Sequence, residues 1–164
     1  MIADGRVYLD TNIFIYGLEG GNDASDRIAE LLIRGASARK RFFTSAFVAA
    51  ELFVIPYREG NLDIIAQYEH VLSGNGIEVL PLSPLAYRYA AALRAGKPSL
   101  KLPDALHLAM AILGEASHFL TADSGITAPL DLAGPAVLIS PSSDLAIIRP
   151  DLPTLDALLK SLDS

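Results

Sequence analysis

Four acidic residues stand alone in otherwise uncharged parts of this 164-residue chain. Asp10, Glu51, Asp104 and Asp123 are each the only Asp, Glu, Lys or Arg in their segments, which are 7–18, 42–57, 102–114 and 116–130, respectively. The segments are rich in apolar residues, so we expect them to be largely buried. A buried carboxylate is costly unless it is paired, protonated or bound to a metal. The pattern therefore requires partners for these charges, and no basic residue lies inside any of the four segments.

Taken one at a time, three of the acids also have a purely structural explanation. Asp10 could satisfy a turn, Asp104 would lie in the first turn of a helix after Pro103, and Asp123 could cap a helix. If the four carboxylates converged, however, they would repel one another strongly without a cation between them. Both interpretations remain open from these residues alone.

The type of ligand points to a particular class of cation. Four carboxylates, with no Cys in the chain and no clustered His, suit a hard ion such as Mg²⁺ or Mn²⁺ rather than zinc. One or two such ions can activate a bound water and stabilise charge on a leaving oxygen. Protein-bound Mg²⁺ also takes ligands from substrate phosphates. This chemistry predicts hydrolysis of phosphodiester bonds.

The apolar pattern predicts strands that alternate with helices. We expect strands at 7–9, 42–44, 77–80, 118–120 and 136–139, and helices at 13–18, 23–40, 46–55, 62–72, 84–94, 102–113 and 154–162. Pro56 should end the helix at 46–55, because proline disfavours helix at the residue before it. Strands that alternate with helices are typical of an α/β fold with a mostly parallel sheet.

This order of elements should bring the acids together. Sites in open parallel α/β sheets form at the carboxyl ends of the strands. Asp10 and Asp123 each follow a predicted strand, Glu51 lies in the helix after the second strand, and Asp104 begins the helix that leads into the strand at 118–120. The sequence therefore predicts one site at this edge of the sheet.

The net charge of −6 argues at first against a nucleic-acid partner, because affinity for phosphates normally comes from Lys and Arg. If cations neutralise the four lone carboxylates, the rest of the chain carries only −2, so an RNA or DNA substrate stays possible. Two basic stretches are candidate phosphate contacts, although either could simply be a solvated helix face. They contain Arg34, Arg39, Lys40 and Arg41, and then Arg88, Arg94, Lys97 and Lys101.

Composition supports a globular protein without a membrane span. The chain is 51% hydrophobic and 20% charged, and no apolar run approaches the roughly 18 residues that a membrane helix needs. The segment before the first strand is too short for a signal peptide, so we expect a soluble, cytoplasmic protein. We expect one main domain at 1–131, with a last strand and a C-terminal extension at 132–164 packed on it.

Four stretches resemble the successive motifs of PIN domains, and most closely those of the small VapC-type ribonuclease toxins. The stretches are VYLDTNIFIY, TSAFVAAELFVIPYREGN, LPDALHLAMA and HFLTADSGI, and the resemblance covers about residues 6–130. It implies a Rossmann-like α/β/α sandwich and a metal-dependent endoribonuclease that uses Mg²⁺ or Mn²⁺. It also implies a cognate antitoxin as partner and a homodimer.

The resemblance assigns residues to the site. The family's four acids correspond to Asp10, Glu51, Asp104 and Asp123, and the hydroxyl or amide residues beside them correspond to Thr11, Asn12, Ser45 and Thr121. Arg39, Lys40 and Arg41 are the candidate RNA contacts. We expect His107 to be a packed, hydrogen-bonded histidine rather than a catalytic one.

Two other functions fit the same residues. A phosphatase with Asp10 as nucleophile would usually need a second Asp two positions later, and that position is Asn12. A catalytically silent RNA-binding or scaffold PIN protein would keep the fold and use metal structurally. The four intact acids favour the nuclease over both.

Overall fold

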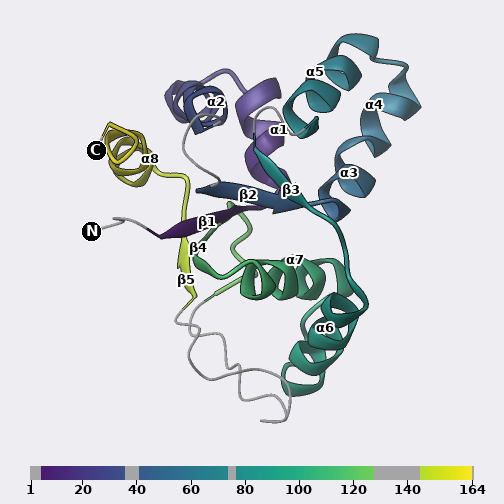
Figure 1. The fold of residues 1–164 in the computed structure, drawn as a ribbon. Coiled ribbons are helices and arrows are strands. Elements are labelled where there is room, and N and C mark those ends of the chain that lie inside the picture. Colours follow the sequence, from purple (N-terminus) through teal and green to yellow (C-terminus); the bar gives the residue numbers. More distant parts are fainter. Residues whose placement is uncertain (1–4, 36–40, 74–76, 128–144, 164) are drawn as a thin grey trace.

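The computed structural model describes residues 5–35, 41–73, 77–127 and 145–163. Its centre is a parallel sheet of β1 (Arg6–Leu9), β2 (Phe42–Ser45), β3 (Glu78–Leu80), β4 (Ala116–Leu120) and β5 (Ala146–Ile148). The strand order is β3-β2-β1-β4-β5, and every neighbouring pair is parallel (Figure 1). The predicted α/β fold with a parallel sheet is confirmed.

Helices cover both faces of the sheet (Figure 1). One layer contains α1 (Thr11–Glu19), α2 (Asp23–Gly35) and α8 (Leu152–Lys160), and the other contains α6 (Pro84–Gly96) and α7 (Leu102–Leu113). Three helices, α3 (Phe47–Leu52), α4 (Val54–Glu59) and α5 (Leu62–Leu72), connect β2 to β3, and α3 and α5 contact α1. The result is the α/β/α sandwich that the resemblance implied.

Alternation along the strands builds a separate core on each face. Val7, Leu9 and Phe42 pack toward α1, α2 and α8, while Tyr8 and Phe43 pack toward α6 and α7. Successive side chains of a strand point to opposite faces, so a fully apolar strand feeds both cores. None of these five side chains is more than 1% exposed. The one polar group among them, the Tyr8 hydroxyl, therefore lies on the α7 side of the sheet.

The region around Pro56 differs from the prediction. Instead of one helix ending before the proline, the chain forms α3, breaks at Phe53 and continues as α4, in which Pro56 is the third residue. The first backbone N–H groups of a helix have no acceptor within the helix, so proline loses no hydrogen bond there. The predicted stop at Pro56 was wrong because the helix had already ended at Phe53.

The last strand of the sheet was not predicted. The strand expected at 136–139 lies outside the described residues, and β5 is formed by Ala146–Ile148, which pair with His118–Leu120 of β4. The sequence predicted no strand at these positions. Three residues followed by Arg and Pro give too short a pattern to distinguish a strand from a loop.

After β5, α8 packs on α2. Asp151 caps α8 by accepting a hydrogen bond from the backbone N–H of Thr154 at 2.9 Å, and Arg27 of α2 pairs with Asp156 at 2.7 Å. Leu155 and Leu158 are fully buried in the core on this side of the sheet. These contacts attach the described part of the extension to α2 and to the core on this side of the sheet, and the predicted division at 131 and 132 stays a prediction.

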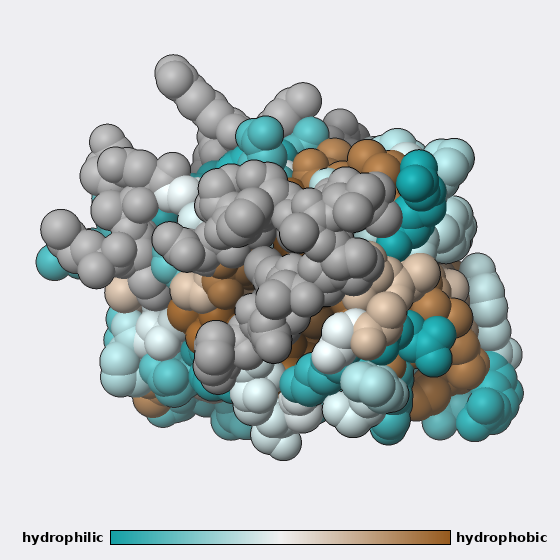
Figure 2. Space-filling model, turned by 90° about the horizontal axis from the view of Figure 1, so that it is seen from below, coloured by the Kyte–Doolittle hydropathy of each residue, from teal (hydrophilic) through white to brown (hydrophobic). Residues whose placement is uncertain are grey.

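The outer side of the α6 and α7 layer carries apolar as well as polar surface (Figure 2). Leu85, Tyr87 and Leu102 are 42–55% exposed on these two helices. By contrast, every residue of α7 from Ala105 to Ala111 is buried. Within the described ranges, none of the helices has the length and hydrophobicity needed to cross a bilayer.

If α8 is part of the same cooperative unit, Leu158→Ala should destabilise the whole chain. Truncating a fully buried leucine costs about 2–5 kcal/mol in free energy of unfolding. Chemical denaturation followed by circular dichroism and by tyrosine fluorescence should show one shared transition at lower denaturant. Leu152→Ala, in the same helix but at a position 40% exposed, is the matched control and should have a small effect. An unchanged main transition in Leu158→Ala would separate α8 from the domain.

Candidate active site

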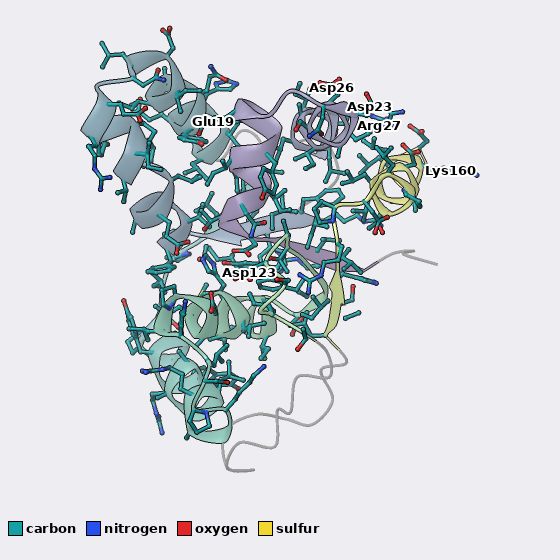
Figure 3. The ribbon with its side chains drawn as sticks, turned by 180° about the vertical axis from the view of Figure 1, so that it is seen from behind. Glu19, Asp23, Asp26, Arg27, Asp123 and Lys160 are labelled. Atoms are coloured by element: carbon teal, nitrogen blue, oxygen red, sulfur yellow. The ribbon has the colours of Figure 1, made fainter. Side chains whose placement is uncertain are left out.

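The strand order places Asp10 and Asp123 at neighbouring strand ends. β1 lies between β2 and β4, so the chain leaves β1 toward one side and later returns on the other. Ligands of open α/β sheets bind at such a reversal, outside the carboxyl ends of the strands. The backbone N–H of Asp10 donates to the carbonyl of Leu120 at 3.1 Å, which continues the β1–β4 pairing into the site. The predicted meeting of these two acids is observed, and Figure 3 shows Asp123 beside α7, between the two helical layers.

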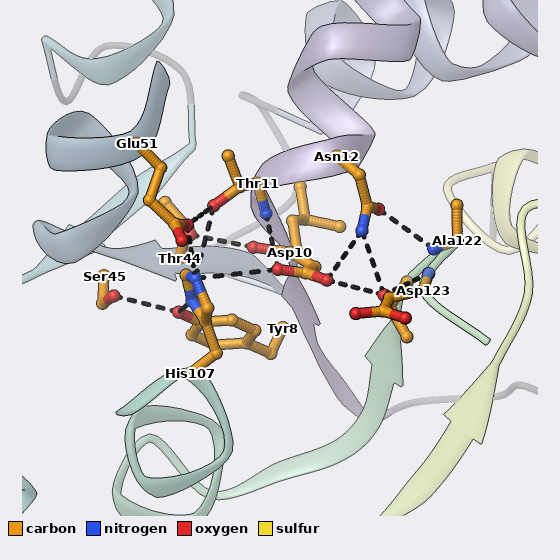
Figure 4. A network of polar contacts seen from close by, with 12 residues as sticks. Tyr8, Asp10, Thr11, Asn12, Thr44, Ser45, Glu51, His107, Ala122 and Asp123 are labelled. Atoms are coloured by element: carbon orange, nitrogen blue, oxygen red, sulfur yellow. Dashed lines mark hydrogen bonds and ion pairs between the residues drawn. The ribbon is translucent and has the colours of Figure 1, made fainter. Parts of the chain in front are cut away.

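Asp10 is held by neutral hydrogen-bond donors (Figure 4). It caps α1 and is only 5% exposed. Its Oδ1 accepts from the backbone N–H of Thr11 at 2.8 Å, and its Oδ2 accepts from Thr121 Oγ1 at 2.6 Å and Asn12 Nδ2 at 2.8 Å. The capping explanation is therefore correct, and the same bonds fix the carboxylate at the strand end.

Asn12 and Thr121 also connect the two strand ends. Asn12 Oδ1 accepts from the backbone N–H of Ala122 at 3.0 Å, and Thr121 Oγ1 accepts from the backbone N–H of Asp123 at 2.9 Å. The exposed Asp123 side chain is turned by a bond from the backbone N–H of Gly125 to its Oδ1 at 2.8 Å. The backbone of Asp123 is thus positioned by the residues that hold Asp10.

Glu51 reaches the site from α3 and meets His107 of α7. His107 Nε2 lies 2.7 Å from Glu51 Oε2 and 3.7 Å from Asp10 Oδ1, and the hydroxyl of Thr11 donates to the same Glu51 oxygen. Burial disfavours the charged form of Glu51, but the bonds from His107 and Thr11 outweigh it, so the pKa of Glu51 is lowered. Glu51 is therefore held as a carboxylate.

Behind His107 lies a second layer of polar groups. The Tyr8 hydroxyl is 2.8 Å from His107 Nδ1 and 2.9 Å from Ser45 Oγ. Burial raises the pKa of Tyr8 far above its usual value, so its hydroxyl keeps its proton. Ser45 was expected beside the acids. In the structure it contacts Tyr8, which in turn contacts His107, so Tyr8 and His107 lie between Ser45 and Glu51.

Asp104 lies in the first turn of α7, where the negative charges of other acids act on its carboxyl group. Its pKa is raised by burial and then by the negative charges of Asp123 and Asp10, against smaller opposing effects of His107 and Lys101. The carboxylates of Asp123 and Asp10 are thus close enough to Asp104 to disfavour its charged form. This repulsion is in the direction that we expected if the acids converged.

The acids match a hard cation in chemistry and in charge. Within the part of the chain that the structure describes, no three His, Asp or Glu side chains lie close enough together to hold a metal ion by themselves. The available ligands are nevertheless oxygens, and the pKa of Asp104 is raised by burial and then by the negative charges of Asp123 and Asp10, whose repulsion a cation would relieve. Asp10, Asp104 and Asp123, with Glu51 beside Asp10, are the residues that would hold Mg²⁺ or Mn²⁺, and water or substrate oxygens would complete the ligands.

Of the three basic residues expected to contact RNA, the structure describes only Arg41. Arg39 and Lys40 lie outside the described residues. Arg41 precedes β2, so it is at the end of the sheet opposite to the acids, and it donates to the carbonyl of Ser161 at 3.1 Å. RNA contact by Arg41 stays a prediction, and this position does not favour it. Lys101 immediately precedes α7 and lies closer to the site, since its charge contributes to lowering the pKa of Asp104.

Sequence reasoning missed part of the network. His107 is buried and hydrogen-bonded as expected, but one of its partners is an acid of the site. Its spacing of three residues from Asp104 on one helix was the available signal, because such residues share a face. Tyr8 gave no signal, since an aromatic residue in an apolar strand is usually core.

Arg149, which follows β5, holds the loop that carries Asp123. Its guanidinium donates to the carbonyls of Thr121 at 3.2 Å, Asp123 at 2.5 Å and Ile126 at 2.5 Å. The extension after the last predicted motif therefore contributes directly to the geometry of the site. No pattern in the sequence connects Arg149 with Asp123.

Comparison with known proteins identifies the family of this chain. The model of the PIN domain family matches residues 7–129, so the chain belongs to the PIN domain family. The match includes all four acids and ends before β5 and Arg149. No curated protein matches the chain.

Solved structures share the fold at low sequence identity. A toxin–antitoxin complex from Klebsiella pneumoniae contains a chain with 21% identity and a TM-score of 0.61, covering 88% of this chain and 98% of that one. VapBC2 from Rickettsia felis, bound to a DNA fragment from its promoter, contains a chain with 20% sequence identity and a TM-score of 0.59. The match covers 88% of this chain and 98% of that one. FitAcB from Neisseria gonorrhoeae contains a chain with 19% sequence identity and a TM-score of 0.60, and the match covers 88% of this chain and 97% of that one. At these identities the likeness shows the fold.

The repulsion at Asp104 predicts that Asp104→Asn stabilises the protein in EDTA at pH 8. A raised carboxyl pKa means that the ionised form destabilises the fold, so removing the charge should raise the Tm. The gain should be below about 1 kcal/mol, because the group is partly exposed. It should shrink as the pH falls and Asp104 becomes protonated.

Asp63→Asn is the matched control for this substitution. Asp63 lies in the first turn of α5 and is exposed, so its replacement should slightly lower the Tm by removing a favourable charge from a helix N-terminus. A lower Tm for Asp104→Asn under the same conditions would contradict the repulsion.

Arg149→Ala should loosen the loop at 121–126. Loss of charge-assisted bonds to three carbonyls is expected to speed exchange of the Gly125 and Ile126 amides about tenfold or more, because each such bond contributes about 1.5–3 kcal/mol. Hydrogen exchange read by NMR measures this. Arg88→Ala, at an exposed position of α6, should leave the two amides unchanged. Unchanged exchange of the two amides in Arg149→Ala would show that the loop keeps its conformation without Arg149.

Proposed function

We propose that this protein is an endoribonuclease dependent on Mg²⁺ or Mn²⁺ that hydrolyses RNA phosphodiester bonds, and that it is the toxin of a toxin–antitoxin pair. The observation that supports the proposal is that Asp10, Asp104 and Asp123 lie near one another at the carboxyl edge of a PIN fold, where the charges of Asp10 and Asp123 act on Asp104. One or two cations fit there.

The chain's own residues would bind and orient. Asp10, Asp104, Asp123 and Glu51 would hold the cation, which when bound would activate water and stabilise the leaving oxygen. Asn12 and Thr121 keep Asp10 and the loop of Asp123 in a fixed relation, and Thr11 does the same for Asp10 and Glu51.

Substrate phosphates would approach along the basic side of α6 and α7. Arg88 and Arg94 are exposed on α6, and Lys101 is exposed at the start of α7, beside Asp104. Cationic side chains near an acidic site allow a polyanion to bind despite the net charge of −6. These residues are better placed for this role than Arg41.

A protein partner fits the exposed apolar surface on the other side of the sheet. Val54, Ile55 and Tyr57 of α4 are 48–63% exposed. Contiguous apolar groups of this kind favour protein contacts. Together with the toxin–antitoxin complex named above, they support a cognate antitoxin as partner; we also propose a homodimer and a cytoplasmic location.

The two alternatives make different demands on the site. A phosphatase with Asp10 as nucleophile lacks the second acid, and Asn12 instead donates a hydrogen bond to Asp10. A silent RNA-binding or scaffold protein would not need the repulsion at Asp104. Both remain as outcomes of the test below.

The test is cleavage of a panel of structured and single-stranded RNAs by purified protein. We expect cleavage with Mg²⁺ or Mn²⁺, none in excess EDTA, and a loss of at least about a hundredfold in Asp10→Asn, because the substitution removes a charge that would hold the cation. Asp63→Asn, which removes an exposed charge in the first turn of α5, should cleave as the parent does.

Three results would contradict the proposal. Cleavage that persists in excess EDTA would show that hydrolysis does not depend on a metal ion. Hydrolysis of a phosphomonoester with no action on RNA would favour the phosphatase. Tight RNA binding that is unchanged by Asp10→Asn, without turnover under any metal condition, would favour the silent protein.

A further inference from the structure

His107 is a buried group at the site to which the proposed function assigns no role. It lies on α7, is 2% exposed, and has both ring nitrogens within hydrogen-bond distance of other side chains. Nε2 faces Glu51, and Nδ1 faces Tyr8. A histidine that served only to fill the core would not need a carboxylate partner on another helix.

The chemistry of the partners decides the direction of these bonds. The ionised Glu51 carboxylate has no proton to give, so His107 Nε2 must carry the hydrogen and donate it. In a neutral imidazole, Nδ1 then accepts, and the Tyr8 hydroxyl donates to it. Ser45 can in turn donate to the Tyr8 oxygen. With a neutral imidazole the hydrogen bonds would run in one direction, from Ser45 through Tyr8 and His107 to Glu51.

The chain of bonds starts from a rigid part of the core. The ring of Tyr8 stacks on Phe119 with centroids 5.2 Å apart and meets the edge of Phe43 at 5.4 Å. Phe47 packs edge-on against His107 at 5.2 Å. The imidazole is therefore in contact with aromatic side chains from β1 and from α3.

Glu51, by contrast, comes from an element that does little to fix it. It lies on α3, a six-residue helix with no side-chain cap, and its side chain is 31% exposed. Ordering a glutamate side chain costs up to about 2 kcal/mol in conformational entropy. His107 and Thr11 both bind Oε2, and no described residue forms a hydrogen bond with Oε1. Two donors on one oxygen orient the other for a further ligand.

We propose that His107 is a positioning residue that fixes Glu51 beside Asp10 through its Nε2–H, and that Tyr8 and Ser45 hold the imidazole in the required tautomer. Glu51 could otherwise turn toward solvent. The contribution to hydrolysis rests on the proposed function, whereas the placement of Glu51 can be tested on the metal-free protein.

The first experiment is NMR of metal-free protein with ¹⁵N-labelled histidine. At a pH where His107 is neutral, we expect its proton on Nε2 with Nδ1 bare, and Tyr8→Phe to weaken that preference without abolishing it, because Glu51 still accepts from Nε2–H. His118, which lies 2.8 Å from Ser117 through its Nδ1, is the internal control and should not respond to Tyr8→Phe. Protonation of His107 on Nδ1 alone would overturn the proposal.

The second experiment compares His107→Gln with His107→Leu. The glutamine amide can place an N–H near the position of Nε2, whereas leucine cannot, and both lose the bond from Tyr8. Calorimetry with Mn²⁺ alone should show about 10–100-fold weaker binding for His107→Leu, as for loss of other groups that hold a metal ligand in place, and substantial recovery for His107→Gln. Equal losses in both variants, tracking their Tm, would show a merely structural role.

RNA cleavage separates this proposal from the proposed function. If the parent cleaves RNA, kcat should fall in His107→Leu and recover in His107→Gln, with KM little changed, because Glu51 and not the RNA contact is disturbed. If the parent cleaves no RNA, the proposed function fails, while the tautomer and the Mn²⁺ affinities still decide the role of His107. Cleavage by His107→Leu at the parental rate would overturn the proposal.

Discussion

The structure depends on keeping negative charge at the carboxyl edge of a buried sheet. Asp10 is 5% exposed, and its described hydrogen bonds come from a backbone N–H, an amide and a hydroxyl rather than from Lys or Arg. Neutral donors orient a carboxylate without cancelling its charge. The charge of Asp10 therefore persists, and after burial and the charge of Asp123 it contributes to raising the pKa of Asp104. A site of this kind is less stable than a neutral one, and it suits the cation that we propose.

Three parts of the chain support this edge from different directions. α1 begins on Asp10 and brings Thr11 and Asn12, so the first turn of one helix contacts both Glu51 and the β4 end. α7 supplies Asp104 on its first turn and His107 on the same face. The stretch after β5 supplies Arg149, which ties down the loop of Asp123. Because each support comes from a separate element, the geometry depends on the packing of the whole sandwich.

The success of sequence reasoning varied with the strength of the local signal. The helices at 62–72 and 102–113 were predicted with the bounds that the structure shows, because their apolar spacing and terminal residues agree. The break at Phe53 was missed because α3 and α4 have one continuous apolar pattern across it. β5 was missed because three residues carry no detectable period. Arg41 was overvalued, since a cluster of positive charge says nothing about which end of a strand it occupies.

The sequence by itself determined the parallel α/β fold, because the period of the apolar residues is a local property. It also singled out four isolated acids, whose function stays a prediction. Thr11, Asn12 and Thr121 were also found beside Asp10, as the family resemblance implied. Only the tertiary structure decided that His107 meets Glu51, that Tyr8 and Ser45 stand behind it, and that Arg149 holds the loop of Asp123. Each of these contacts joins residues far apart in the chain, and such pairings follow from how strands and helices pack rather than from any pattern within one segment.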